Sequence, residues 1–286
     1  MSELTFVGLG AMGSAIVHVL LENNCDLTVW NRSQEKADYL VSLGAKRATS
    51  IEEAIAASPR IMICIDSFPN TQKLLDTDKI RSLLPGKSIV QLSTGTPAEA
   101  REAESWITGN GGKLIAATIM VYPISIGKPE AQFLVSGPEN EYQDCARYFS
   151  YLGEDVRYLG SSIGASAALN LAVLSRLVAN AIGIVHGAHV CESEGVDLVE
   201  FARMFPEGDR AQTIVKAIST NDFTVDGGAS VDVAAGVAKS LQSQAKDLGI
   251  NSELPDFSMG IIQRAIDAGY QDEDAAAQIK ILRRDK

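Results

Sequence analysis

The chain has 286 residues, which is enough for a nucleotide-binding domain and a second domain. Its formal net charge of −11 argues against nucleic acid or an anionic membrane surface as a main partner. Its four cysteines are scattered without a C-x-x-C pair, and no signal peptide precedes the first apolar strand, so we expect reduced thiols and a cytoplasmic location.

Strand-like and helix-like segments alternate from residue 4 to about residue 160. Apolar runs predict strands at Leu4–Val7, Leu27–Trp30, Ile61–Ile65, Ser88–Leu92, Leu114–Ile119, Gln132–Ser136 and Val156–Leu159. Helical patterns follow several of these strands, at Ala11–Glu22, Gln34–Leu43, Ile51–Ala57, Thr71–Leu84 and Pro97–Thr108. This alternation predicts an α/β domain with a mostly parallel, doubly wound sheet of the Rossmann type over residues 1–160.

The remainder of the chain is helical in pattern. A long apolar stretch over about residues 163–193 predicts one interdomain helix, and Arg176 near its middle argues against a membrane span. Further helices are expected at Asp197–Met204, Arg210–Ile218, Ser230–Leu248, Leu254–Ala268 and Asp272–Leu282. We therefore expect an all-helical domain over residues 161–286, which begins with that interdomain helix.

The first strand runs directly into a G-x-G-x-x-G loop that opens a helix. In this setting Gly8 allows the tight turn, Gly10 lets the backbone approach a pyrophosphate, and Gly13 lets the helix pack closely on its strand. The start of the helix offers unpaired N–H groups to the phosphates. The predicted dinucleotide loop comprises Gly8, Leu9, Gly10, Ala11, Met12 and Gly13.

The end of the second predicted strand indicates which dinucleotide binds. NAD-binding domains usually place a carboxylate there for the ribose hydroxyl, whereas this chain has Asn31, Arg32 and Ser33, with Lys36 one turn later. A guanidinium matches the geometry of a phosphate, so the sequence predicts NADP(H) as the cofactor. The alternative is that these cations belong to an ordinary solvated loop.

Several motifs together resemble one enzyme superfamily. The stretches G-L-G-x-M-G, N-R-S with a following lysine, and L-S-T-G-T-P at residues 92–97 are similar to the β-hydroxyacid dehydrogenase and 6-phosphogluconate dehydrogenase superfamily. Within it, residues 119–127, 133–137, 230–233 and 254–256 are most similar to the imine reductases and reductive aminases. The resemblance implies an NADPH-dependent reductase of C=N bonds that takes a small imine or amine substrate. It also implies an intertwined homodimer.

The resemblance also assigns roles to particular residues. The nicotinamide would lie near Ser93 and Thr94, which follow a strand, and Asn170 would face the imine nitrogen. Tyr122 is a candidate proton donor or substrate contact, and a structural aromatic residue is the alternative for it. The expected substrate pocket comprises Met120, Tyr122, Pro123, Leu174, Val178 and Asp232. We expect no metal, because His186, His189 and Cys191 have no fourth ligand close in the sequence.

Asn170 separates this chain from the hydroxyacid dehydrogenases, which carry a lysine at that position. An amide does not titrate in the useful range and cannot act as the base for an alcohol. We therefore expect reduction of preformed, basic cyclic imines, with weak condensation of ketone and amine. The alternatives are a β-hydroxyacid or semialdehyde dehydrogenase acting on C=O, or a non-catalytic NADP(H)-binding protein. For Asn170 itself the alternative is a core asparagine.

Overall fold

A computed structural model describes residues 1–225 and 228–285. The chain divides into two compact units, Met1–Asn170 and Leu171–Lys286. The division falls inside helix α8 (Ala165–Glu194), so this helix contributes its first turns to one unit and the rest to the other.

The first unit is built on one sheet. Within the described residues the strand order is β3-β2-β1-β4-β5-β6-β7-β8. Neighbouring strands are parallel, with β6 and β7 as the antiparallel pair. The strands are β1 (Leu4–Val7), β2 (Leu27–Trp30), β3 (Lys46–Arg47), β4 (Arg60–Ile63), β5 (Ser88–Gln91), β6 (Lys113–Ile119), β7 (Gln132–Ser136) and β8 (Asp155–Tyr158). The direction of winding reverses between β1 and β4, where such sheets bind nucleotides.

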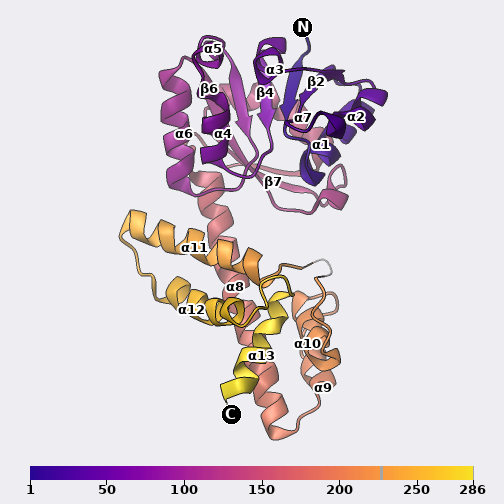
Figure 1. The fold of residues 1–286 in the computed structure, drawn as a ribbon, viewed down its shortest axis with the longest axis vertical. Helices are drawn as coiled ribbons and strands as arrows, with labels where there is room; N and C mark the ends of the chain where they lie inside the picture. The colour runs from indigo at the N-terminus through magenta and orange to yellow at the C-terminus, as the bar shows by residue number, and fades with distance from the viewer. Residues whose placement is uncertain (226–227, 286) are drawn as a thin grey trace. The chain divides into compact units, whose positions relative to one another are not determined.

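Helices cover both faces of the sheet (Figure 1). The central strands are therefore apolar on both sides: Phe6 packs into the core cluster of one layer and its neighbour Val7 into that of the other. The first layer contains α1 (Ala11–Glu22), α2 (Asp38–Ser42) and α7 (Glu139–Leu152). The second contains α3 (Ile51–Ala57), α4 (Phe68–Leu75), α5 (Asp78–Arg81) and α6 (Pro97–Gly109).

The fold class is confirmed, and each predicted strand differs from the observed one by no more than two residues at either end. The single helix predicted over Thr71–Leu84 is wrong, because Thr77 caps a second helix, α5, by accepting from the N–H of Ile80. The helix predicted over Gln34–Leu43 begins as a 3-10 turn, η1 (Gln34–Ala37). The capping box formed by Thr96 and Glu99 at the start of α6 is as expected.

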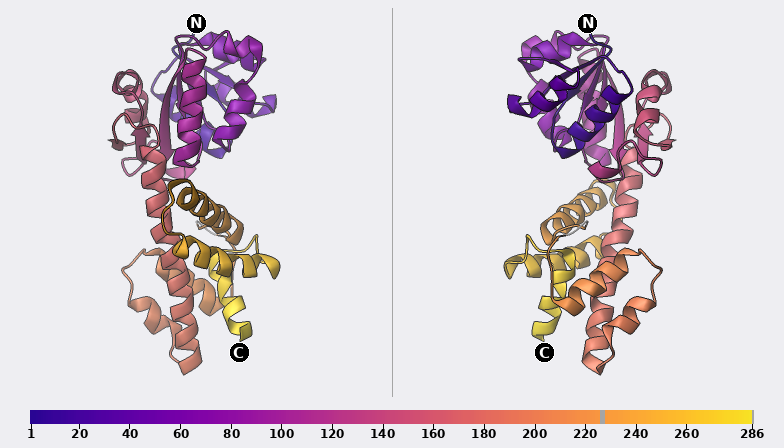
Figure 2. Two further views of the ribbon diagram at one scale, coloured as in Figure 1. Left: turned by 90° about the vertical axis from the view of Figure 1, so that its left-hand side faces the viewer. Right: turned by 90° about the vertical axis from the view of Figure 1, so that its right-hand side faces the viewer.

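The regular elements of the second unit, within its described residues, are helices joined by loops (Figure 2). Its core joins α8 to the shorter helices that follow it, and α11 packs beside α12. The helices after α8 are α9 (Leu198–Arg203), α10 (Arg210–Thr220), α11 (Val231–Leu248), α12 (Glu253–Asp267) and α13 (Ile279–Leu282), with 3-10 turns η3 (Ala275–Gln278) and η4 (Arg283–Asp285). The single helix predicted over Asp272–Leu282 is therefore wrong, because this segment forms η3 and α13.

Within the described chain, α8 is the helix whose length and apolar composition would suffice to cross a membrane. One third of its most apolar 18-residue window is buried inside the chain. Core helices of soluble proteins meet the same two criteria. The prediction that the chain does not bind a membrane therefore stays a prediction.

Candidate functional site: the crevice beside the glycine-rich loop

The three glycines of the motif, Gly8 and Gly10 in the loop after β1 and Gly13 in the first turn of α1, have different surroundings. Gly8 has a φ of +98°, and a Cβ there would lie 2.2 Å from the carbonyl oxygen of Cys64. A Cβ at Gly13 would lie 2.0 Å from the carbonyl oxygen of Gly8. A Cβ at Gly10 would meet no atom within 4 Å. Packing therefore requires glycine at residues 8 and 13, whereas the space beside Gly10 is open.

Helix α1 begins beside this open space. Its N-cap, Gly10, provides no side-chain hydrogen bond, and its first turn carries no acidic residue. The first N–H groups of a helix have no partner within the helix, and its N-terminus carries a partial positive charge. The start of α1 is therefore suited to hold an anion such as a diphosphate.

Asn31, just after β2, joins the glycine-rich loop to the corner at residues 31–33. Its side-chain Oδ1 accepts a hydrogen bond from the N–H of Leu9 at 2.9 Å. Its Nδ2 donates to the carbonyl oxygen of Ser33 at 3.0 Å. The amide thus makes contacts within the protein at both ends, and the Leu9 N–H is engaged as well. Arg32 and Lys36 carry the exposed positive charges of this corner.

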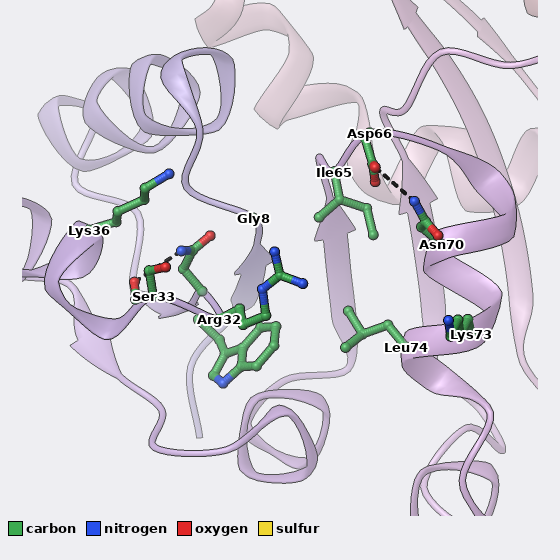
Figure 3. Close-up of a pocket in the computed structure, with 11 residues that line it drawn as sticks. Gly8, Arg32, Ser33, Lys36, Ile65, Asp66, Asn70, Lys73 and Leu74 are labelled. Atoms are coloured by element: carbon green, nitrogen blue, oxygen red, sulfur yellow. Dashed lines mark hydrogen bonds between the residues drawn. The ribbon is translucent and has the colours of Figure 1, made fainter.

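A cavity of about 430 Å³ opens between this corner and α4. Figure 3 shows Ser33 and Lys36 on one side of Gly8 and Asp66, Asn70 and Leu74 on the other, with the Arg32 side chain extending into the space between them. The lining residues are Gly8, Trp30, Asn31, Arg32, Ser33, Lys36, Ile65, Asp66, Asn70, Lys73 and Leu74. Three of them are cations and one is a carboxylate, so the cavity suits a ligand with several phosphates.

The α4 side of this cavity was missed from the sequence. Asp66 follows β4 closely, and its carboxylate accepts a hydrogen bond from Nδ2 of Asn70 at 2.7 Å. Lys73 and Leu74 lie one turn further along the helix. The sequence could have indicated this side of the cavity. The strand that forms β4 was predicted, and the carboxyl ends of neighbouring parallel strands lie at the same edge of a sheet.

Burial raises the pKa of the nearby Cys64 thiol to about 11, so this thiol is protonated at neutral pH.

Ser93 and Thr94 lie beyond β5 on the same edge of the sheet. The N–H of Leu92 donates to the carbonyl oxygen of Ile63 in β4, which places the two strand ends side by side. Ser93 is buried and its hydroxyl oxygen lies 2.7 Å from Nε2 of Gln91, whereas Thr94 is exposed. Neither residue lines the cavity described above.

Asn170 lies near the start of α8. One turn earlier, Ser166 fixes this helix to the sheet, because its N–H and its hydroxyl both contact the hydroxyl of Ser136 in β7. Residues 166 and 170 share a helix face. Asn170 is 6% exposed, and its amide makes no hydrogen bond within the part of the chain that the structure describes. It therefore keeps its capacity to bind a ligand or a water molecule.

The residues predicted to line a substrate pocket are divided between the two units. Met120 and Tyr122 follow β6, Pro123 begins the 3-10 turn η2 (Pro123–Ser125), and the Tyr122 side chain is 59% exposed. Leu174 and Val178 lie on α8 beyond the division between the units. Asp232 is exposed in the first turn of α11. The structure thus brings the predicted cofactor corner together, whereas the grouping of the substrate residues stays a prediction.

Comparison with known proteins adds independent findings. The family model for the NAD binding domain of 6-phosphogluconate dehydrogenase matches residues 3–160, and the model for the C-terminal domain of NADPH-dependent reductive aminase-like proteins matches residues 162–284. An NADPH-dependent reductive aminase from Aspergillus oryzae is 31% identical, over 96% of this chain and 95% of that protein.

Two further relatives are similar over nearly the whole chain. The structure of an imine reductase from Myxococcus stipitatus in complex with NADP+ is 27% identical, with a TM-score of 0.67, over 98% of this chain and 99% of that one. A chloroplastic glyoxylate/succinic semialdehyde reductase from Arabidopsis thaliana is 26% identical, over 98% of this chain and 79% of that protein.

Proposed function

The chain belongs to the imine reductase and reductive aminase family, within the β-hydroxyacid dehydrogenase (6-phosphogluconate dehydrogenase-like) superfamily, and we propose that it reduces carbon–nitrogen double bonds. It is an NADP(H)-dependent oxidoreductase. When bound, NADPH supplies the hydride. The observation that carries the choice of C=N over C=O is Asn170, a buried amide where alcohol chemistry would need a titratable group.

We propose a place in the first unit for each part of the cofactor. The open space at Gly10 and the start of α1 would hold the diphosphate. Arg32, Ser33 and Lys36 would hold the 2′-phosphate, and Asn31 would keep that corner in position. Ser93 and Thr94 would contact the nicotinamide half, since they lie further along the same sheet edge.

Asn170 limits the chemistry that the site performs. Its amide donates and accepts hydrogen bonds but cannot supply a proton at pH 7. A basic cyclic imine is already protonated in solution, so its reduction needs only orientation and a hydride. Holding the reactants in the right geometry lowers a barrier substantially without any proton transfer. The preferred substrates are therefore preformed cyclic imines rather than separate ketones and amines.

A substrate panel tests this function. NADPH oxidation is followed with a cyclic imine, with a ketone plus an amine, and with succinic semialdehyde, and NADP+ reduction is followed with a 3-hydroxy acid. We expect the highest kcat/KM with the cyclic imine. The similarity to the semialdehyde reductase favours succinic semialdehyde as the second candidate substrate. Turnover of the carbonyl substrates alone would reverse the assignment, and NADPH binding without any turnover would indicate a non-catalytic protein.

The role of Asn170 is tested by two substitutions. Asn170→Ala removes the hydrogen bonds to the substrate and should lower kcat/KM for the cyclic imine about tenfold. Asn170→Asp introduces a titratable group at the same place and should favour the reaction that starts from ketone and amine. Unchanged rates in both variants would remove Asn170 from the mechanism.

We also propose a homodimer in the cytoplasm. The second unit exposes several large apolar side chains, which a soluble monomer would rarely carry together. They are Leu177 and Val190 on α8, Val233 on α11, and Leu254 and Phe257 on α12.

The proposed cytoplasmic location rests on the cysteines. All four are free, which suits a reducing compartment.

A further inference from the structure

A chain of buried hydrogen bonds connects α4 to Ser93. Gln91, the last residue of β5, is 1% exposed. Its side-chain Nε2 lies 2.7 Å from the hydroxyl oxygen of Thr71 on α4 and 2.7 Å from that of Ser93. Thr71 and Ser93 are also buried. One amide group therefore bridges a helix and the loop beyond β5.

The direction of each hydrogen bond follows from counting protons. The Thr71 hydroxyl has a single proton, and its oxygen lies 3.1 Å from the carbonyl oxygen of Ser67, which can only accept. Thr71 therefore turns a lone pair toward Gln91. That fixes the orientation of the Gln91 amide, because its NH₂ group and not its oxygen must face the hydroxyl. The second N–H of the same group then points to Ser93, whose oxygen accepts it.

This arrangement leaves the Ser93 proton free. Within the described residues no protein acceptor takes it, although the side chain is only 5% exposed. A buried hydroxyl that already accepts a strong hydrogen bond gains most from a partner that accepts in turn. Ser93 stands at the carboxyl edge of the sheet, beyond β5 and next to the end of β4.

We propose that Gln91 is a positioning residue for the cofactor, which holds Ser93 as a hydrogen-bond donor toward an acceptor oxygen of the nicotinamide half of NADPH. Thr71 fixes the amide of Gln91 and so takes part in the same arrangement. This inference rests on the proposed function, in which Ser93 contacts the nicotinamide half. It adds two residues that never touch the cofactor but determine which hydrogen bond Ser93 can make.

Double-mutant analysis of NADPH binding tests the inference. NADPH affinity is measured by fluorescence without any imine, and thermal unfolding is recorded for every variant. Ser93→Ala removes the donor and should weaken NADPH binding about tenfold. Gln91→Glu places an acceptor beside Ser93, which captures its proton, and should weaken binding by a similar factor. Combined with Ser93→Ala, Gln91→Glu should cause less than a twofold further change, because its effect acts through Ser93.

A milder pair of variants covers the case in which the buried glutamate prevents folding. Thr71→Val keeps the shape but lets the Gln91 amide rotate, and should weaken NADPH binding about threefold only while Ser93 is present. Thr71→Ser keeps the hydroxyl and should restore wild-type affinity. Two results would overturn this inference without affecting the proposed function. One is that Thr71→Val and Ser93→Ala weaken NADPH binding by factors that multiply in the double variant. The other is that Ser93→Ala leaves the affinity for NADPH unchanged. Wild-type protein that fails to bind NADPH would overturn the proposed function as well.

Discussion

Gly10 and Gly13 stand three residues apart in one motif but are glycine for different reasons. We predict that Gly13→Ala destabilises the fold by about 1–3 kcal/mol, because its Cβ would lie 2.0 Å from a backbone oxygen. Gly10→Ala should cost at most about 1 kcal/mol of stability, the difference between glycine and alanine at an N-cap. It should weaken NADPH binding at least tenfold, because its Cβ fills the space proposed for the diphosphate.

Urea unfolding and NADPH fluorescence measure the two effects separately. Gly13→Ala should mainly lower the free energy of unfolding, whereas Gly10→Ala should mainly lower the affinity for NADPH. Should Gly10→Ala bind NADPH as tightly as wild type, the diphosphate does not lie at the start of α1.

Buried thiols make the stability of the protein sensitive to alkaline pH. Burial raises the pKa of Cys145 from 9.0 to about 11, which means that the unfolded chain loses this proton at a lower pH than the folded chain does. The stabilisation is complete below pH 9 and is lost as the pH rises toward 11. Each such thiol contributes a slope of at most about 1.4 kcal/mol per pH unit in this window.

We predict that the free energy of unfolding of Cys145→Ala falls less steeply with pH than that of wild type. Urea titrations between pH 8.5 and about pH 10.5 should show a difference in slope of more than half a proton. The comparison of slopes cancels the titration of the lysines and tyrosines common to both proteins. Parallel curves would mean that Cys145 does not titrate differently in the two states.

At the level of elements, α6 begins directly after the loop that carries Ser93 and Thr94. Thr96 accepts a hydrogen bond from the N–H of Glu99, and the Glu99 carboxylate accepts one from the N–H of Thr96. Thr96→Ala removes half of this capping box and should cost about 1 kcal/mol in urea unfolding. Thr96→Ser keeps the hydroxyl and serves as the control. A loss of the same size in Thr96→Ser would attribute the effect to the methyl group instead.

Two elements, β3 and α7, were not predicted from the sequence, for different reasons. Strand β3 has two exposed residues, Lys46 and Arg47, and is a strand only because it pairs with the edge of β2. Helix α7 did carry a usable signal, since its buried residues Cys145, Tyr148, Phe149 and Leu152 have helical spacing. Its many polar residues concealed that spacing. Short strands depend on partners, whereas this helix could have been predicted.

The candidate site was also predictable only in part. The glycine-rich loop and the corner with Arg32 follow from local spacing, because each lies within a few residues of a strand end. The partner of Asn31 is the Leu9 N–H, 22 residues earlier, and this contact depends on the register of β1 against β2. The link from Thr71 to Ser93 likewise depends on how α4 packs. Contacts between distant segments are set by tertiary packing, which a single sequence does not display.

At the level of the whole molecule, the exposed apolar residues of the second unit predict self-association. We expect the chain to sediment at twice the mass of one copy. Phe257→Glu places a charge at a side chain that is 61% exposed and should shift the protein toward monomer. Tyr39→Glu, at a side chain of the first unit that is 62% exposed, is the matched control and should leave the mass unchanged. A wild-type monomer at micromolar concentration would contradict the proposed dimer.

The bridge formed by Asn31 restricts how the coenzyme preference could be redesigned. Aspartate at residue 31 would still accept from the Leu9 N–H, but it could not donate to the carbonyl oxygen of Ser33. Introducing the carboxylate typical of NAD enzymes there would therefore loosen the phosphate corner and the glycine-rich loop together. Arg32 points into the cavity without being part of that bridge (Figure 3). A route toward NADH should thus begin at Arg32 and keep Asn31 unchanged.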